Sequence, residues 1–529
     1  MRRYVLGCTQ VEQAESSALT FEQVTLTWQD VSYSVPVGKG EQRQLLDSIS
    51  GMAAPGRLVA LMGSSGAGKT TLLDVLAGRK NVGTVSGTIS LNGQRMEHEH
   101  KRLLGYVEQF DSHIPLQTVR EALQFSANLR LPASTPADRK RKAVDETLEL
   151  LSLTKIADVM VGDSKSGGIS PGQRKVLSIG VELIANPPIL FLDEPTTGLD
   201  SRSALQAMQA IRAVASANHT VVCTIHQPSA ELFYMFNDLV LLKSGGRLVY
   251  AGPIGFRGSE MVSYFQALPG VLPHPPRLNP ASWALQLLVD GARLDGARAS
   301  AESISAARRD TNVSFLAQDA EAIDFAASFA AAPARESMSK AITETPKEPL
   351  MPPGDQAGRW VQTANVLRRH ALAQVRDIPY NGLRALMFPL LGLLFGLSFL
   401  DLEADSVSGL LVLTGSLVTC VSFSFVVYVQ STAPWMMEVR NVFYRESYAS
   451  MYGALSFTLA QVLVDVPFVA VFQLCILAPF YFLAGLEADV GIFFHSYLIF
   501  FFAGLAGSYM GQFFVAFLPN DQVVSNNKR

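Results

Sequence analysis

The residues most suited to chemistry form a glycine-rich loop that reads Gly63-Ser64-Ser65-Gly66-Ala67-Gly68-Lys69-Thr70-Thr71. The loop follows the apolar run 58–62 and precedes a segment of helical periodicity, which predicts a turn between a buried strand and a helix. Its glycines let backbone N–H groups point inward, where they and the helix N-terminus can hold phosphates. Lys69 is predicted to reach the outer phosphates of a nucleotide and the Thr70 hydroxyl to bind Mg²⁺. A glycine-rich turn without a ligand is the alternative.

Two carboxylates follow a second apolar run, 189–192, at Asp193 and Glu194. A buried parallel strand would deliver Asp193 to the shell of a bound Mg²⁺. Glu194 is placed to polarise a water for in-line attack on a γ-phosphate, because phosphoryl transfer needs an oriented nucleophile. A solvated strand end is the alternative interpretation of this pair.

His226 follows a third apolar run, 221–225. Open α/β sheets bind ligands at the carboxyl ends of their strands, so we expect His226 to contact the γ-phosphate. A lone histidine is more often structural than catalytic, and that alternative stays open.

Further segments are similar to motifs of a known family, and they read Gly105-Tyr106-Val107-Glu108-Gln109-Phe110-Asp111, Thr197-Gly198-Leu199-Asp200, His226-Gln227-Pro228-Ser229 and Asn279-Pro280-Ala281-Ser282-Trp283. The first resembles the Q-loop and the second the D-loop of ATP-binding cassette transporters of the ABCG subfamily. The resemblance covers essentially the whole chain and is closest to the second half of pleiotropic-drug-resistance members. It implies ATP and Mg²⁺ as cofactors, Gln109 as a catalytic residue and metal ligand, and Asp200 as part of the nucleotide site.

The family signature, Leu-Ser-Gly-Gly-Gln, is replaced here by Ile169-Ser170-Pro171-Gly172-Gln173. Ser170 is predicted to cap a helix, and proline suits the first helical turn because its missing N–H does no harm there. The resemblance implies that Ser170, Gly172 and Gln173 meet the nucleotide bound to the opposite ATPase domain. A helix cap without nucleotide contact is the alternative, since Pro171 replaces a glycine. Tyr33 is the nearest candidate for an aromatic residue that stacks on adenine.

Composition changes along the chain, which has 529 residues of which 48% are hydrophobic. A net charge of -3 gives no reason to expect nucleic acid as a partner, and four scattered cysteines imply neither a metal site nor a disulfide framework. We expect an α/β P-loop ABC ATPase domain followed by an all-α transmembrane domain, an incomplete ABCG-type bundle. The predicted boundaries are 1–20 for an N-terminal tail, 21–290 for the ABC nucleotide-binding domain, 291–358 for a linker of short helices in a mobile connector, 359–380 for an amphipathic connecting helix, 381–520 for the transmembrane domain and 521–529 for a cytosolic tail.

Four apolar stretches, 383–400, 409–429, 455–483 and 490–518, have close to the roughly 20 residues that cross a hydrocarbon core. The acidic connectors 401–405 and 487–489 lack Lys and Arg, whereas Arg440 and Arg445 lie between the second and third stretches. By the positive-inside rule the ATPase domain and both termini are expected in the cytosol.

Three membrane-proximal features complete the expectation. The segment 360–376 has helical spacing of apolar residues against a basic face and is expected along the inner membrane surface, although a surface helix has the same pattern. The segment 438–446 resembles the family's coupling segment in a cytosolic loop. Asp465 is expected near the inner interface, paired with a basic residue, or facing the bundle interior.

The resemblance implies a multi-pass integral membrane protein that exports amphipathic or lipophilic compounds with ATP. It would act as a half-transporter paired with a second ABCG-type half, as a homodimer or heterodimer. Family members have six spans in each half, so the chain is expected to be truncated after its fourth span; an incomplete gene model, a short isoform and a piece of a larger transporter all stay open. The alternative function is a truncated, non-exporting regulatory or inactive partner subunit that binds ATP.

Overall fold

The structure is a computed structural model that describes residues 23–38, 41–163, 167–297, 316, 323–350, 355, 357–400 and 406–517. The predicted tails 1–20 and 521–529, the connector 401–405 and much of the linker lie outside the described residues. The chain divides into two compact units, one of Met1–Asp111, Arg130–Asp158 and Ile169–Asp355, the other of Ser112–Leu129, Val159–Gly168 and Gln356–Arg529. Two segments that we expected inside the nucleotide-binding domain therefore belong to the compact unit of the membrane helices.

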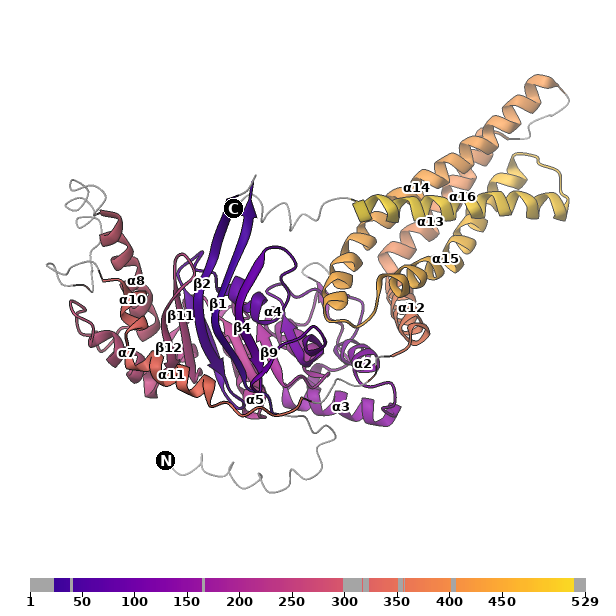
Figure 1. Cartoon of the computed structure of the whole chain (residues 1–529). Coiled ribbons are helices and arrows are strands. Elements are labelled where there is room, and N and C mark those ends of the chain that lie inside the picture. The colour runs from indigo at the N-terminus through magenta and orange to yellow at the C-terminus, as the bar shows by residue number, and fades with distance from the viewer. Residues whose placement is uncertain are drawn as a thin grey trace. The chain divides into compact units, whose positions relative to one another are not determined.

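A sheet of ten strands, counted within the described residues, is the centre of the first unit (Figure 1). In order across the sheet the strands are β5 (Gln94–Arg95), β4 (Thr84–Leu91), β1 (Leu26–Val37), β2 (Glu41–Ala53), β12 (Arg247–Pro253), β11 (Asp238–Lys243), β3 (Leu58–Gly63), β10 (Thr220–Thr224), β9 (Ile189–Leu192) and β6 (Leu104–Val107). Strands β5, β4, β1 and β2 pair antiparallel, whereas β11, β3, β10, β9 and β6 pair parallel. The parallel strands β3, β10 and β9 are buried along their whole length, as their continuous apolar sequences predict.

The parallel pairing of these strands determines where the predicted site residues lie. In β3, β10, β9 and β6 all carboxyl ends lie at the same edge of the sheet. The glycine-rich loop, His226, Asp193 and Gln109 each follow one of these strands directly or within two residues. The sheet topology alone therefore gathers them.

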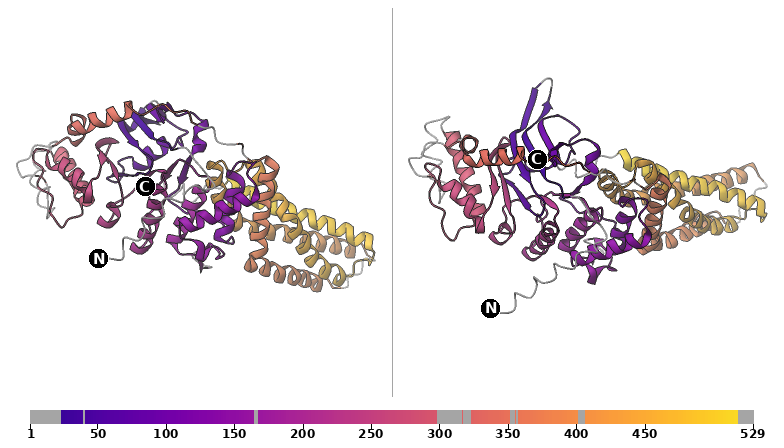
Figure 2. Two further views of the ribbon diagram at one scale, coloured as in Figure 1. Left: turned by 90° about the horizontal axis from the view of Figure 1, so that it is seen from below. Right: turned by 60° about the horizontal axis from the view of Figure 1, so that its bottom comes forward.

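Helices cover the sheet of the first unit (Figure 2). They are α1 (Lys69–Leu76), α3 (Ala137–Leu150), α4 (Pro171–Leu183), α5 (Ser201–Ser216), α6 (Ala230–Phe233), α7 (Ser259–Gln266), α8 (Pro280–Ala297), α10 (Phe325–Ala330) and α11 (Pro333–Thr343), with short 3₁₀ helices at Glu99–Leu103, Thr154–Ile156 and Phe256–Gly258. The last two α-helices are the short helices expected in the linker. They pack on β12 and β2 with Phe325 and Phe329 almost fully buried, so this part of the linker is docked on the sheet rather than a mobile connector.

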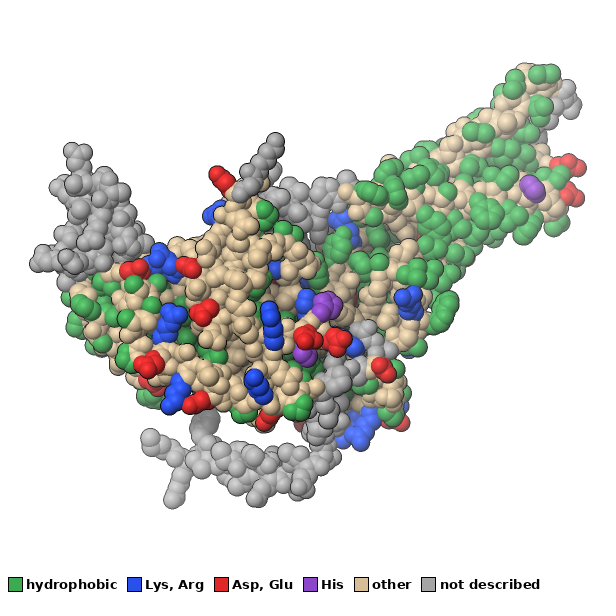
Figure 3. Space-filling view, viewed as in Figure 1, with side chains coloured by type: hydrophobic (Ala, Val, Ile, Leu, Met, Phe, Trp, Pro, Cys, Tyr) green, Lys and Arg blue, Asp and Glu red, His purple; other side chains and the backbone are tan. Residues whose placement is uncertain are grey.

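The second unit holds α2 (Val119–Arg130), α12 (Arg359–Arg376), α13 (Ile378–Ser398), α14 (Val407–Tyr448), α15 (Ala454–Leu483) and α16 (Val490–Phe517), with a small antiparallel pair of β7 (Gly162–Asp163) and β8 (Gly167–Gly168). Helices α13 to α16 are long and apolar enough to cross a membrane, which confirms the four predicted stretches. Helix α14 packs on α16 and α13 on α15. Figure 3 shows hydrophobic side chains over the visible surface of these helices, as a lipid-facing surface requires.

The predicted loop between the second and third stretches is instead helical. Helix α14 has 42 residues, about 63 Å at 1.5 Å per residue, which is twice the hydrocarbon thickness. Arg440 and Arg445 therefore lie on the last turns of α14, where Arg440 Nη1 donates to the Val515 carbonyl at 2.5 Å. The prediction of a loop was wrong because apolar residues continue at helical spacing through Val439 and Val442, both of which are buried.

Helix α12 forms as predicted, but its buried face is the polar one. Val361 and Val375 on the apolar face are 50% and 65% exposed, whereas Arg369 and His370 are 4% and 0% exposed. Arg369 donates to both Glu446 carboxylate oxygens, at 2.6 and 2.8 Å, and lies 3.7 Å from the Phe125 ring centre. An outward apolar stripe beside membrane helices suits contact with lipid better than with water.

Asp465 faces the interior of the helix bundle. It is 5% exposed and accepts hydrogen bonds from Ser508 Oγ and Gln512 Nε2, both at 2.6 Å. Of the three positions expected for this acid, the structure has the last, in which neighbouring donors stabilise the buried carboxyl group.

Candidate active site

The glycine-rich loop connects β3 to α1 and encloses the Lys69 side chain. Lys69 is 6% exposed, and its ammonium donates to the carbonyls of Gly63 and Ser64, both at 3.1 Å. Gly68 has a φ of 89°, and a Cβ there would lie 2.9 Å from Leu46, so the turn into the helix needs glycine. Burial lowers the pKa of Lys69, while the charges of Glu194 and Asp193 act in the opposite direction.

Asp193 is the centre of a group of oxygen atoms at the end of β9. Its Oδ1 accepts from the Thr70 hydroxyl at 3.0 Å and from the Thr224 hydroxyl at 2.7 Å. Burial raises the pKa of Asp193, and the two hydroxyl donors partly oppose that shift. Mg²⁺ prefers hard oxygen ligands and keeps several waters and phosphate oxygens, so one carboxylate and one hydroxyl are a fitting protein contribution.

Glu194 is held beside Gln109. Gln109 Nε2 donates to Glu194 Oε2 at 2.8 Å, and the Thr197 hydroxyl donates to the same oxygen at 3.0 Å. The Glu194 backbone has a φ of 43°, an uncommon conformation for a non-glycine residue that concentrates at functional sites. Its N–H donates to Thr224 Oγ1 at 2.7 Å, which joins Glu194 to the oxygen group around Asp193.

Two residues of this site were missed by sequence reasoning. Thr224 is the last residue of β10 and bonds both acidic residues, but a threonine inside an apolar run carries no signal of that role. Lys175 is 1% exposed, and its ammonium donates to the carbonyls of Glu108 and Gln109 and pairs with Asp111 at 3.0 Å. Its place two residues after Gln173 was the available hint.

The signature segment begins α4 as predicted. Ser170 Oγ accepts from the Gln173 N–H at 3.2 Å, and the Gln173 side chain accepts from the Ser170 N–H at 2.9 Å. This reciprocal pair is a capping box, with Pro171 in the first turn. A Cβ on Gly172 would lie 2.6 Å from the Ser203 Cβ, so glycine allows α4 to approach α5 closely.

The remaining predicted residues fall into two groups. Asp200 caps α5 by accepting from the Arg202 N–H at 3.2 Å, and its pKa is lowered chiefly by a hydrogen bond from Ser203. His226 is exposed directly beyond β10. Within the described residues, neither the signature nor Asp200 hydrogen-bonds to the glycine-rich loop, so one chain alone does not bring them to its own site.

Tyr33 has a different environment from the one that stacking requires. Its side chain is 4% exposed, and its hydroxyl donates to the Val82 carbonyl at 2.5 Å. The ring is covered within the antiparallel strands, where a Cβ on Gly83 would lie 2.9 Å from it. This geometry disfavours Tyr33 as the residue that stacks on adenine.

Comparison with known protein families supports the assignment of these residues to one site. The ABC transporter family model matches residues 46–197, which contain the glycine-rich loop, Gln109 and the Asp193–Glu194 pair. The matched segment is a P-loop ABC ATPase domain. ABC-2 type transporter models match residues 361–526 and 226–321. The chain is an integral membrane protein in which the ABC ATPase domain precedes an ABC-2 type membrane region.

Curated plant proteins are similar to almost the whole chain. ABC transporter G family member 43 of Arabidopsis thaliana is 36% identical over 519 residues, 97% of this chain and 36% of that relative. Member 41 of the same plant is 38% identical, over 95% of this chain and 35% of that relative. Member 49 of Oryza sativa subsp. japonica is 36% identical, over 96% of this chain and 34% of that relative. The chain thus spans about a third of the length of the curated relatives it matches.

Among solved structures, a dimeric bacterial ABC transporter cassette aligns with the chain at 23% identity and a TM-score of 0.37. The alignment covers 43% of this chain and 98% of the cassette. A similarity of this size has no bearing on how the chain assembles.

Proposed function

We propose that the chain is the ATPase and membrane half of an ABCG-type exporter, which hydrolyses ATP at a nucleotide sandwich with a second half. The exported compounds are amphipathic or lipophilic. The observation that carries the proposal is the hydrogen-bonded series from Thr70 through Asp193 and Thr224 to Glu194 and Gln109. It joins residues at the ends of four strands into one hydrogen-bonded group, which supports a phosphoryl-transfer site in a chain that also has four helices long and apolar enough to cross a membrane.

Each residue of the site has a role in this proposal. The loop 63–71 holds the phosphates, and Lys69 turns from the loop carbonyls to the outer phosphate oxygens. Thr70, Asp193 and Gln109 would hold Mg²⁺, which would supply charge neutralisation at the phosphates. Glu194 orients the attacking water, and His226 contacts the γ-phosphate from its exposed position after β10.

In this proposal each half completes the nucleotide site of the other. Four residues of this chain would contact the nucleotide bound to a second ATPase domain, from another copy or a related half: Ser170, Gly172, Gln173 and Asp200. Each lies at a helix N-terminus, where N–H groups and the helix dipole favour phosphate. The ATPase domain and both termini are proposed to lie in the cytosol, following the basic residues near the end of α14.

One observation favours a second candidate function, a regulatory subunit that binds ATP without export. Pro171 replaces glycine in the signature and occupies the first turn of α4, so it has no N–H to offer a phosphate. Such a subunit would complete a partner's site poorly while its own loop still bound nucleotide.

The experiment that separates the candidates is an ATPase assay on the purified full chain and a Glu194→Gln variant. We expect Glu194→Gln to keep ATP binding and to lower turnover about a hundredfold or more, because the water-orienting carboxylate is lost while the phosphate loop is intact. The matched control is Glu149→Gln on the exposed side of α3, which should hydrolyse ATP like the unaltered chain.

Two results would change the proposal. Turnover of Glu194→Gln at the unaltered rate would remove Glu194 from its role. An unaltered chain that binds ATP but hydrolyses none, alone or mixed with a related half, would favour the regulatory subunit.

A further inference from the structure

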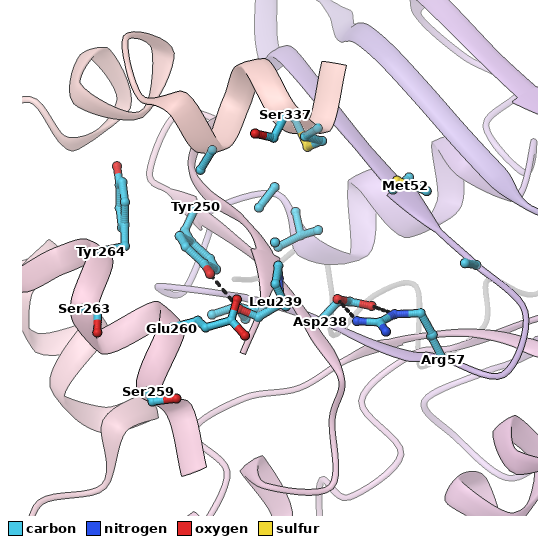
Figure 4. Close-up of a pocket in the computed structure, with 17 residues that line it drawn as sticks. Met52, Arg57, Asp238, Leu239, Tyr250, Ser259, Glu260, Ser263, Tyr264 and Ser337 are labelled. Atoms are coloured by element: carbon cyan, nitrogen blue, oxygen red, sulfur yellow. Dashed lines mark hydrogen bonds and ion pairs between the residues drawn. The ribbon is translucent and has the colours of Figure 1, made fainter. Parts of the chain in front are cut away.

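A cavity of about 710 Å³ lies in the first unit, away from the phosphate loop (Figure 4). Its walls are strands β2, β11 and β12 with helices α7 and α11. Figure 4 shows Tyr250, Tyr264 and Glu260 gathered at one end and the Arg57–Asp238 pair at the other. The volume is within the range of pockets that hold small organic molecules.

The charged groups of the cavity favour a cation. Arg57 donates from Nε and Nη2 to the two Asp238 carboxylate oxygens, at 2.6 and 2.5 Å, and this hydrogen bonding is the main reason that the pKa of Arg57 is raised. Glu260 forms no ion pair in the described part of the chain, so two carboxylates face one guanidinium. The cavity therefore carries one excess negative charge.

The aromatic groups favour a cation of organic character. The Tyr250 and Tyr264 rings lie 5.2 Å apart, and Met52 and Met338 add polarizable surface. The Tyr250 hydroxyl donates to the Pro253 carbonyl at 2.6 Å, whereas the buried Tyr264 hydroxyl has no hydrogen-bond partner. Tyrosine faces attract ammonium groups, most strongly where water is excluded.

We propose that this cavity binds a small organic cation, an arylalkyl- or alkylammonium. Its ammonium group lies beside the Glu260 carboxylate and the half-buried Tyr264 ring, and its apolar part lies against Met52 and Met338.

The cavity is separate from the nucleotide site but shares strands with it. Strand β11 begins at the cavity with Asp238 and ends five residues later at Lys243, about 17 Å away, beside the phosphate loop. There the Leu242 carbonyl would lie 2.4 Å from a Cβ on Gly63. ATP and the cation therefore bind without competing for the same space.

The test is protection of a cysteine introduced at Ser263, an exposed residue of the cavity lining. The full-length Ser263→Cys chain is alkylated with N-ethylmaleimide, and mass spectrometry of its peptides reports the rate at this position alone. Benzyltrimethylammonium should slow the reaction in a saturable way. Benzylsulfonate, which is similar in size but anionic, should not, and excess Mg-ATP should leave the protection unchanged.

Two variants test whether the protection by benzyltrimethylammonium depends on the Glu260 carboxylate. Adding Glu260→Gln should raise the benzyltrimethylammonium concentration for half-protection about fivefold to tenfold. The matched control is Glu336→Gln, which removes an exposed carboxylate from α11 outside the lining and should leave that concentration unchanged. Equal protection by the sulfonate, displacement by Mg-ATP, or equal behaviour of the two variants would overturn the proposal. Both substitutions are on exposed side chains, so the melting temperature should not change.

Discussion

At the scale of single residues, Lys175 ties the signature helix α4 to the Q-loop segment. Its ammonium holds the carbonyls of Glu108 and Gln109, and Asp111 is held by both Lys175 and the Ser178 hydroxyl. Gln109 in turn bonds Glu194. If the proposed site is correct, Lys175 is therefore a positioning residue, which acts on the reacting atoms through the backbone of the segment 105–111.

The substitution Lys175→Met is expected to lower ATP turnover about tenfold and to raise the Mg²⁺ concentration for half-maximal rate, because Gln109 loses its support. Lys142→Met is the control, since that side chain is 50% exposed on α3. Steady-state assays over a range of Mg²⁺ concentrations measure both quantities. A lowered melting temperature with unchanged turnover and Mg²⁺ response per folded molecule would reduce Lys175 to a purely structural role.

Much of the candidate site could be predicted from residue types and their spacing. The phosphate loop, Asp193, Glu194 and Gln109 are recognisable because their chemistry allows few substitutes. Thr224 and Lys175 were not recognisable, because their roles depend on which strand and helix lie beside them. Tyr33 shows the converse, since an aromatic residue on a strand looks the same whether its ring is open or covered.

At the scale of elements, α12 is held by a buried ion pair. Arg369 and Glu446 have side chains that are 3% and 2% exposed, and Tyr452 donates to the same carboxylate at 2.6 Å. Arg369→Met should cost about 3–5 kcal/mol, because it leaves a buried carboxylate without its main partner. Thermal unfolding in detergent measures this loss. Arg368→Met, one residue earlier and exposed, is the control, and an equal effect of the two would contradict the argument.

The ends of α15 test the membrane orientation. Its 30 residues span about 45 Å, enough to place its ends on opposite sides of a bilayer. We expect Ala488→Cys to react with an impermeant maleimide on intact cells and Gly453→Cys to react only after permeabilisation, because basic residues cluster near the latter. A Cβ at Gly453 has open space around it. The reverse labelling would place the ATPase domain outside the cytosol.

Hydropathy predicted the four membrane-crossing stretches well, but it did not predict that the second helix continues beyond its apolar stretch. The apolar stretches end near residue 429, but α14 continues to Tyr448 because Val439 and Val442 find a buried face within the protein. The burial of the polar face of α12 also results from contacts with neighbouring elements. Periodicity identifies an amphipathic helix, but only its neighbours decide whether the apolar face meets protein or lipid.

At the scale of the whole molecule, the proposed ATP hydrolysis requires a second ATPase domain. The strand topology gathers the loop, the acidic pair and the Q-loop within one domain, whereas the signature and Asp200 cap other helices. An open γ-phosphate face admits water and weakens electrostatic stabilisation of the transition state. Hydrolysis per chain should therefore rise with the concentration of chain in the membrane, a dependence that assays on proteoliposomes of graded protein content measure.

The central claim is most directly tested by a cross-link between two differently tagged copies, one with Ser65→Cys and the other with Gln173→Cys, both carrying Glu194→Gln. In the presence of Mg-ATP, a bifunctional thiol reagent should join the two tags, and omission of ATP or addition of Lys69→Ala should prevent it. Absence of any product between the tags, together with ATP hydrolysis per chain that is independent of chain concentration, would contradict the nucleotide sandwich.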